Sequence, residues 1–210
     1  MEEIPGYLDI TPEDFRALYQ VAHDHACRRL RGPAAEAGAA LPAAAVVHPG
    51  LGEIAWSWLG AFLGIAAVAL LQAAWFEGSD RVMLIASFGA SAVLVYGAVR
   101  SPLAQPRNVL GGHVLSALVG VLAFRTLGGL PWLAGAVAVA TAIAVMLATR
   151  TLHPPGGATA LIAVIGGDKI HRLGFAYALV PAAAGALVML AVALVVNNLP
   201  ASRRYPEYWA

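Results

Sequence analysis

The amino-acid sequence predicts an all-α membrane protein: a polytopic helical bundle of about six hydrophobic segments, arranged as two inverted repeats of three. Of the 210 residues, 60% are apolar and only 12% are charged, and the mean hydropathy is +0.72. A soluble domain carries roughly 25% charged residues. The charges between residues 54 and 199 fall in a few short clusters. Between the clusters run apolar stretches near the ~20 residues that cross a bilayer.

Residues 1–50 are predicted to form a soluble appendage, made of a helix over 12–31 and an Ala/Pro/Gly linker. The stretch Thr11-Pro12-Glu13-Asp14 is typical of a helix start, with a hydroxyl cap, a proline and then two acids. We expect this helix to be solvated and packed on the core. Its basic end leaves open a helix lying on anionic lipid. Residues 54–199 are then the transmembrane domain, and residues 200–210 are a cytoplasmic tail.

Two of the hydrophobic segments have unusual lengths. The fifth has only 11 residues and comes directly after His153-Pro154-Pro155-Gly156-Gly157, which no helix passes through unbroken. The sixth is long for one crossing, which favours a tilted helix or one that extends past the bilayer. The six expected segments cover residues 54–75, 82–99, 108–127, 130–149, 157–167 and 173–198.

The basic residues predict the orientation, since loops on the cytoplasmic side carry an excess of Lys and Arg. With six crossings, and counting from residue 28 onward, eight arginines lie on the side of the two termini and four basic residues on the other. We therefore expect both termini in the cytoplasm and the bundle in a bacterial-type inner (plasma) membrane. The eight are Arg28, Arg29, Arg31, Arg100, Arg107, Arg150, Arg203 and Arg204, and the four are Arg81, Arg125, Lys169 and Arg172.

A short motif recurs at an offset of 68 residues. Phe88-Gly-Ala-Ser-Ala-Val-Leu94 aligns with Gly156-Gly-Ala-Thr-Ala-Leu-Ile162. Each copy lies in the middle of a three-segment unit, 54–127 or 130–198. Two such units have opposite orientations in the membrane, as the inverted repeats of many transporters do. The alternative is chance similarity between two Gly/Ala-rich stretches.

Both copies of the motif resemble helix starts, because glycine lets the chain turn and Ser or Thr offers a hydroxyl near the first turn. A half-helix that begins inside the membrane has unpaired N–H groups, which are tolerated where they line a cavity or meet a ligand. A helix N-terminus favours an anion. We therefore predict a binding site for a small inorganic anion, although glycines can also serve helix packing alone. The expected lining residues are Gly89, Ala90, Ser91, Gly156, Gly157, Ala158 and Thr159.

A few other polar residues lie near the motif. His113 and His153 are candidates for gating or proton coupling, because histidine titrates near neutral pH. A hydrogen-bonded structural role is the alternative. Arg100, Arg107 and Asn108 lie in the loop after the second segment and at the start of the third, where they would attract anions to a vestibule. The arginines alternatively reflect only the positive-inside bias.

Several functional classes are disfavoured. No Asp or Glu lies inside a predicted span, so neither catalytic residues nor an intramembrane metal is expected. In His23-Asp-His25-Ala-Cys27, the side chains of the possible metal ligands would point in different directions around a helix, which disfavours a metal site there. A net charge of +1 without a basic face disfavours a nucleic-acid partner. The expected partners are the anion and the lipid bilayer, without a cofactor, and the sequence leaves open whether the chain forms a homo-oligomer.

Three stretches together resemble the HPP family of membrane proteins, named for its His-Pro-Pro motif. They are Ser87-Phe-Gly-Ala-Ser-Ala-Val, Ser101-Pro-Leu-Ala-Gln-Pro-Arg-Asn-Val-Leu-Gly-Gly-His113 and His153-Pro-Pro-Gly-Gly-Ala-Thr-Ala-Leu161. The resemblance covers roughly 54–198. It implies four transmembrane helices, which agrees with six segments if the second and fifth are broken or re-entrant.

Plant chloroplast and cyanobacterial members of the family are described as nitrite transporters, so the resemblance implies nitrite transport. The residues themselves do not choose among nitrite, nitrate, chloride, formate and bicarbonate. They also leave open a channel, a carrier, or a structural or regulatory membrane protein.

Overall fold

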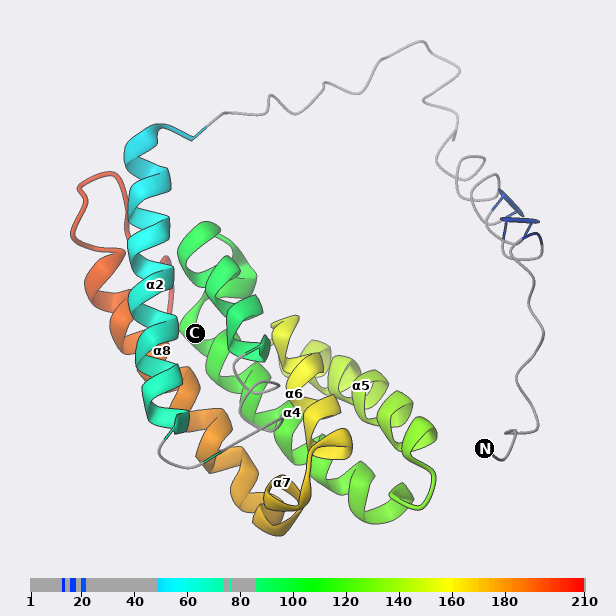
Figure 1. The fold of residues 1–210 in the computed structure, drawn as a ribbon. Coiled ribbons are helices and arrows are strands. Elements are labelled where there is room, and N and C mark those ends of the chain that lie inside the picture. Colours follow the sequence, from blue (N-terminus) through cyan, green and yellow to red (C-terminus); the bar gives the residue numbers. More distant parts are fainter. Residues whose placement is uncertain are drawn as a thin grey trace. The chain divides into compact units, whose positions relative to one another are not determined.

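The computed structural model describes residues 13, 16, 17, 20, 21, 49–73, 76 and 86–209 (Figure 1). The chain divides into two units, residues 1–48 and residues 49–210. The helix predicted over 12–31, the linker and the His23–Cys27 cluster lie almost entirely outside the described residues. The helical bundle belongs to the second unit.

Every regular element of the described residues is helical. The first two in the bundle are α2 (Leu51–Ala73) and a helix over Ala86–Gly97, called helix 86–97, whose last turn is the π-helical η1 (Val93–Gly97). The others are η2 (Pro102–Ala104), α4 (Pro106–Leu127), α5 (Pro131–Ala148), α6 (Pro155–Ile165), α7 (Asp168–Leu173), η3 (Gly174–Ala178), η4 (Leu179–Ala183) and α8 (Ala184–Val196).

Within the part of the chain that the structure describes, four helical stretches are long and apolar enough to cross a membrane. They are Leu51–Ala73, Pro106–Leu127, Pro131–Ala148 and Asp168–Val196. Helix 86–97 and α6 are apolar but shorter, and they correspond to the second and fifth expected segments. The predicted all-α polytopic bundle is therefore confirmed, and four spans with two short helices reconcile the family's four crossings with six segments. The inverted repeat stays a prediction.

The sixth expected segment is interrupted, which differs from the tilted unbroken helix expected over 173–198. Gly174 has φ 51°, in the left-handed region that favours glycine. Val180, with φ −131° and ψ 116°, is extended in front of Pro181. The apolar run is long because the short turns η3 and η4 precede α8.

Proline defines the start of α4, α5 and α6. Pro106, Pro131 and Pro155 each occupy the first helical turn. A proline there costs no hydrogen bond, since the first N–H groups of a helix have no partner within the helix, and its fixed φ suits the helix. The loops before these helices therefore end at well-defined residues.

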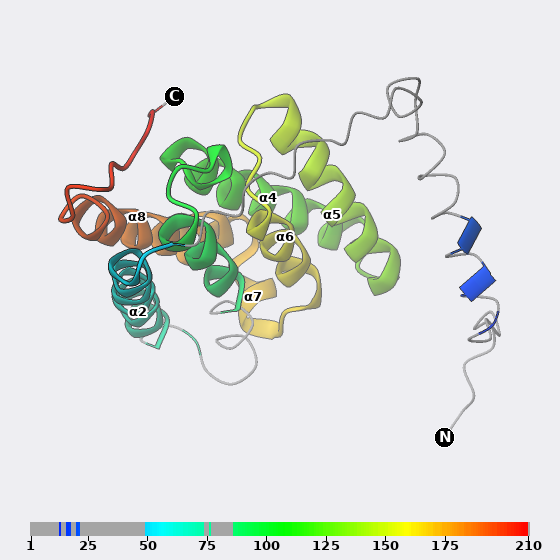
Figure 2. The same ribbon diagram turned by 90° about the horizontal axis from the view of Figure 1, so that it is seen from above.

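The helices pack in two groups. α4 packs on α5 and α6, which also contact each other, while α2 packs on α8 and on η1 (Figure 2). The contact of α4 with α8 and with the turns before it joins the two groups. α4 is the third helix of the expected unit 54–127, and it packs on α5 and α6 of the unit 130–198. α8 is the third helix of the unit 130–198, and it packs on α2 of the unit 54–127.

Small residues allow these close contacts. A Cβ atom on Gly120 of α4 would collide with the backbone carbonyl of Ala160 in α6. On α2, Gly60 and Gly64 leave room for the buried ring of Tyr96, whose hydroxyl donates to the Met189 carbonyl at 3.0 Å. Glycine stripes of this kind are typical of helices that pack closely in lipid.

Large apolar side chains cover the outside of the bundle. Trp58, Phe62 and Leu70 of α2 are exposed, and so are Leu122 of α4 and Leu147 of α5. An apolar exterior of this extent marks a surface that contacts lipid or another protein. Together with the four spans, it identifies a multi-pass integral membrane protein.

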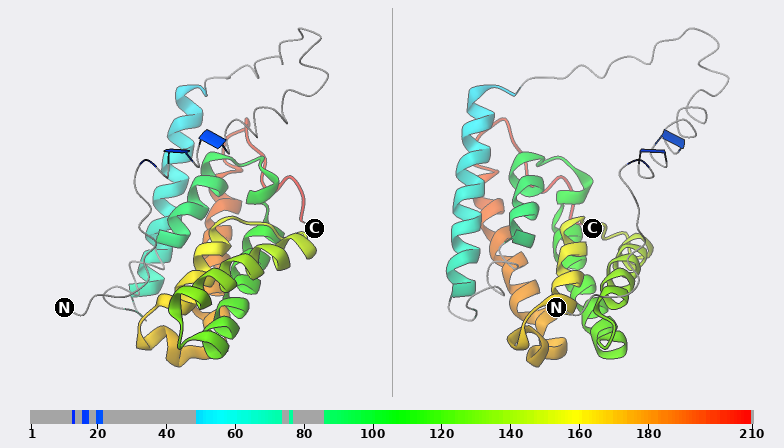
Figure 3. Two further views of the ribbon diagram at one scale, coloured as in Figure 1. Left: turned by 90° about the vertical axis from the view of Figure 1, so that its right-hand side faces the viewer. Right: turned by 45° about the vertical axis from the view of Figure 1, so that its right-hand side comes forward.

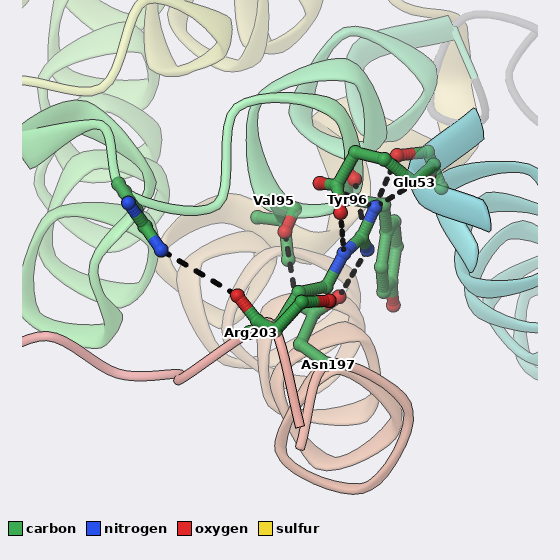
Figure 4. A network of polar contacts seen from close by, with 8 residues as sticks. Glu53, Val95, Tyr96, Asn197 and Arg203 are labelled. Atoms are coloured by element: carbon green, nitrogen blue, oxygen red, sulfur yellow. Dashed lines mark hydrogen bonds and ion pairs between the residues drawn. The ribbon is translucent and has the colours of Figure 1, made fainter. Parts of the chain in front are cut away.

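The segment after α8 returns to the beginning of α2 (Figure 3). The Arg203 guanidinium is only 7% exposed and forms an ion pair with the Glu53 carboxylate, with an Nη2–Oε1 distance of 2.7 Å (Figure 4). Its Nη1 donates to the Tyr96 carbonyl at 3.5 Å, while Asn197 Nδ2 donates to the Val95 carbonyl at 2.9 Å. These two side chains satisfy carbonyl groups at the C-terminal end of helix 86–97.

Candidate functional site

Five buried polar side chains meet in the core of the second unit. They come from helix 86–97, from α4, from the loop before α6 and from α6 itself. Each is at most 3% exposed. We call this group the central cluster, and its members are Ser87, Ser91, His113, His153 and Thr159.

The two short helices contact each other through this cluster. Ser87 and Ser91 are four residues apart, so both lie on one face of helix 86–97. Ser87 Oγ is 3.0 Å from Thr159 Oγ1 and donates to the Pro155 carbonyl at 3.2 Å. Hydroxyls from both short helices therefore share one polar site.

His153 has a defined tautomer. Its Nδ1 lies 2.7 Å from the Leu103 carbonyl, which can only accept a hydrogen bond, so Nδ1 carries the hydrogen. In a neutral ring, Nε2 is then an acceptor. Ser91 Oγ is 2.9 Å from this nitrogen and donates its hydrogen to it.

The same reasoning extends to His113. Because the Ser91 hydrogen points to His153, Ser91 Oγ accepts from His113 Nε2, at 2.9 Å. His113 Nδ1 then has no hydrogen and accepts from Thr159 Oγ1 at 2.7 Å. The donors form one directed chain from Thr159 through His113 and Ser91 to His153 and the Leu103 carbonyl. No carboxylate of the described residues bonds to this chain, so the neutral rings suit their burial.

Glycines and an aromatic ring hold the two imidazoles in place. The Phe88 ring stacks on His113 with 4.7 Å between ring centroids. A Cβ atom on Gly112 would lie 2.5 Å from His153 Cβ, so this close approach requires glycine. Gly156 is similarly confined, because its Cβ would lie 2.8 Å from both the Gly112 carbonyl oxygen and Ser116 Oγ.

The predicted site residues have different surroundings. Ser91, Thr159, His113 and His153 come together. Gly156 packs against α4, whereas a Cβ on Gly157 would make only an ordinary contact with Val139, at 3.8 Å. Gly89 lies inside helix 86–97 rather than before it, and Ala90 and Ala158 are exposed.

The backbone donors at the start of α6 are already paired. Gly156 N–H donates to the His153 carbonyl at 2.8 Å, and Gly157 N–H donates to the Pro154 carbonyl at 3.0 Å. In this conformation the donors that face the centre of the bundle are therefore side chains of the central cluster.

Sequence reasoning did not select four groups that belong here. These are Ser87, the Leu103 carbonyl, Tyr177, whose hydroxyl donates to the Thr159 carbonyl at 3.1 Å, and Ser116, whose buried hydroxyl has no partner. The four-residue spacing of Ser87 and Ser91 was a usable signal. The Leu103 carbonyl and Tyr177 are connected to the cluster only by tertiary folding.

The three residues of the predicted vestibule line two different cavities. Arg107 and Asn108 line a cavity of about 370 Å³ together with Arg150 and Leu152. Arg100 lines a separate cavity of about 510 Å³ with Arg203 and Arg204. Asn108 Nδ2 donates to the Leu152 carbonyl at 2.9 Å, so the first cavity adjoins the residue before His153.

Within the described residues, no three His, Cys, Asp or Glu side chains are grouped as a metal site would require. The central cluster consists of hydroxyls and imidazoles alone. Such groups donate and accept hydrogen bonds and move protons. They carry no fixed charge themselves, and they bind small polar species.

The comparisons with known proteins agree with this architecture. The family described as "HPP, transmembrane region" matches residues 46–206. Two curated transmembrane proteins of Dictyostelium discoideum are 47% and 48% identical to the chain, over 78% and 77% of its length. The matches cover 53% and 57% of those relatives, so the chain spans little more than half of their length. No solved structure matches it. The match over residues 46–206, on a bundle that unites the three motifs in its core, shows that the chain belongs to the HPP family of integral membrane proteins.

Proposed function

We propose that this protein transports a small monovalent inorganic anion, with nitrite as the first substrate to test, through the central cluster. The observation that carries the proposal is the meeting of Ser91 and Thr159 at one buried histidine between two short helices. Polar side chains are rare and costly inside a membrane bundle, and they commonly mark a substrate pathway.

The supporting architecture is that of a transporter with inverted repeats. Helix 86–97 and α6 are each too short to cross the bilayer, and their first turns touch. Discontinuous helices that meet near the centre of the membrane are typical of such transporters. The third helix of each three-segment unit packs on helices of the other unit, which supports a repeat related by a twofold axis. We propose an inner-type membrane and cytoplasmic termini for the same protein.

The Ser91–His153 contact also resembles the nucleophile and base of a hydrolase, since Nε2 is 2.9 Å from Oγ and Nδ1 is oriented by a carbonyl. Transport is the better proposal. Ser91 is fully buried, and its hydroxyl shares a second histidine, which a nucleophile does not need. The N–H groups that would stabilise an oxyanion at the start of α6 are paired.

The anion reaches the cluster, in this proposal, from the cavity lined by Arg107, Asn108 and Arg150. Two guanidinium groups there raise the local anion concentration. Passage requires the hydrogen bonds between Ser91, Thr159 and the histidines to open, because the anion needs these donors itself. The structure therefore corresponds to a closed state of the pathway.

The test is nitrite uptake into proteoliposomes that contain the purified protein, with Thr159→Val against Thr126→Val. Valine keeps the shape of threonine but loses the hydroxyl. Thr126 is exposed and donates only to carbonyls of its own helix, so its replacement is the matched control. We expect saturable uptake that Thr159→Val lowers at least tenfold and Thr126→Val leaves unchanged.

Thr159→Ser restores the hydroxyl and should recover uptake, which separates loss of the site from misfolding. Uptake that is the same in Thr159→Val as in the wild type would contradict the proposed site. Wild-type uptake no faster than in protein-free liposomes, for nitrite and for nitrate, chloride and formate alike, would contradict anion transport.

A further inference from the structure

The directed chain of the central cluster can also run in the opposite direction. We propose that the cluster takes up one proton with each anion and stores the charge on His153, while every hydrogen bond between Thr159 and His153 reverses. This inference rests on the proposed anion transport and adds the coupling ion. It makes the protein a proton–anion symporter of 1:1 stoichiometry.

The proton transfer balances at each atom. A proton that reaches Thr159 Oγ1 displaces the hydroxyl hydrogen to His113 Nδ1. The hydrogen on His113 Nε2 passes to Ser91 Oγ, and the Ser91 hydrogen passes to His153 Nε2. The three transfers cross donor–acceptor distances of 2.7, 2.9 and 2.9 Å. One proton enters, His153 becomes an imidazolium, and no other bond changes.

The reversed chain is fully hydrogen-bonded. His153 then donates from Nδ1 to the Leu103 carbonyl and from Nε2 to Ser91, and Ser91 donates to His113 Nε2. His113 Nδ1–H donates to Thr159, whose own hydrogen points to the Pro155 carbonyl at 3.4 Å. Since no donor or acceptor is lost, the two directions are two states of one site.

The surroundings explain why the proton and the anion would bind together. A lone imidazolium at this depth has no carboxylate among the described residues to pair with, and a lone anion has no charged partner in the cluster. Each costs free energy alone, and each offsets the charge of the other. The neighbouring titratable group on the other side is the Tyr177 hydroxyl, which donates to the Thr159 carbonyl.

His153, at the end of the hydrogen-bonded chain, lies beside the cavity lined by Arg107 and Arg150, which we call the basic cavity. His153 Nδ1 donates to the Leu103 carbonyl. Pro102, which precedes Leu103, and Leu152, which precedes His153, both line this cavity. A proton on His153 therefore lies beside the place where the anion is concentrated.

The first experiment measures both fluxes in proteoliposomes that enclose a pH-sensitive dye and are clamped at zero membrane potential with K⁺ and valinomycin. We expect one proton taken up per nitrite, beyond the background of protein-free liposomes, and a nitrite uptake that a membrane potential does not change. Ser91→Ala should lose the proton flux, Ser91→Thr should retain it, and Val93→Ala, on the exposed face of the same helix, is the control.

The outcomes separate the two proposals. Nitrite uptake without proton uptake, or driven by the membrane potential, overturns the symport and leaves anion transport standing. Absence of uptake of nitrite, nitrate, chloride and formate alike removes the proposed function, and the relay is then judged by a measurement that needs no transport.

That measurement is the ¹⁵N NMR spectrum of labelled histidines in the purified protein, assigned with His113→Gln and His153→Gln. We expect His153 with hydrogen on Nδ1 and His113 with hydrogen on Nε2 in the neutral protein. When acid protonates His153, with or without an added anion, the hydrogen of His113 should move to Nδ1. A His113 that keeps its tautomer when His153 becomes charged would overturn the relay.

Discussion

Ser91 and Thr159 occupy the same position in the two copies of the repeated motif, and they hydrogen-bond to opposite nitrogens of a single imidazole ring. Ser91 Oγ is 2.9 Å from Nε2 of His113, and Thr159 Oγ1 is 2.7 Å from Nδ1. Residues at the same position of the two motif copies thus use one histidine, which has no counterpart at the offset of 68 residues. The Leu103 carbonyl, which accepts from His153 Nδ1, gives the polar chain its direction.

Ser91→Ala is expected to destabilise the protein. The change leaves Nε2 of both His113 and His153 without a partner in a fully buried site. At about 1–3 kcal/mol for each unpaired group, the free energy of unfolding should fall by about 2–4 kcal/mol. Thermal unfolding in detergent micelles measures this against Val93→Ala, and equal melting temperatures for the two variants would contradict the bridging role.

The two adjacent glycines at the start of α6 should respond in opposite ways. In Gly156→Ala the new methyl group meets the Gly112 carbonyl oxygen at 2.8 Å, so α4 and α6 must separate. We expect a loss of about 1–3 kcal/mol in stability. Gly157→Ala meets only Val139, at 3.8 Å, and should gain up to about 1 kcal/mol from helix propensity. Melting temperatures that move in the same direction would disprove this packing.

Two adjacent arginines in the C-terminal segment give another matched pair. Arg203→Ala removes the partner of Glu53 and of the Tyr96 carbonyl, whereas Arg204 is exposed. We expect Arg203→Ala to lower the free energy of unfolding by about 2–4 kcal/mol, less than a fully buried pair would because Glu53 is partly exposed. Arg204→Ala should leave the melting temperature unchanged. A cycle with Glu53→Gln measures the coupling, and strictly additive losses would refute the ion pair.

The basic cavity beside His153 should control the rate of anion entry. Arg107→Gln removes one of two guanidinium groups from this cavity, while Arg100→Gln changes the other cavity. We expect nitrite uptake at low ionic strength to fall several-fold in Arg107→Gln and little in Arg100→Gln. The difference should shrink in about 0.5 M of an impermeant salt, because salt screens exposed charges. An effect of Arg107→Gln that is independent of salt would argue for a contact other than electrostatic attraction.

Local sequence signals predicted the elements well. Apolar length located α2, α4, α5 and α6 to within a few residues, because this signal acts within one segment. The interruption at Gly174 and Val180 was not predicted, since uniform hydropathy over 173–198 conceals a change of backbone conformation.

The candidate site was predicted only in part. The residue types Ser91, Thr159, His113 and His153 were selected from motifs, but their joint hydrogen bonds depend on how four elements pack. The expected use of free N–H groups at the start of α6 assumed an isolated helix end. In the folded chain, the carbonyls of His153 and Pro154 fold back onto these donors. These bonds join residues three apart and form a tight turn at the helix start, which the expectation of free N–H groups left out.

The packing of α2 on α8, which lie near opposite ends of the bundle's sequence, has a consequence for biosynthesis. α2 emerges early from the ribosome, yet its principal long partner, α8, is among the last segments made. Until α8 arrives, the face of α2 that α8 covers must be occupied by lipid or by a membrane chaperone, and the Tyr96 hydroxyl lacks its acceptor, since the Met189 carbonyl comes from the far end of the chain. A ribosome stalled after α6 would therefore leave a half-assembled intermediate in which this face of α2 is uncovered.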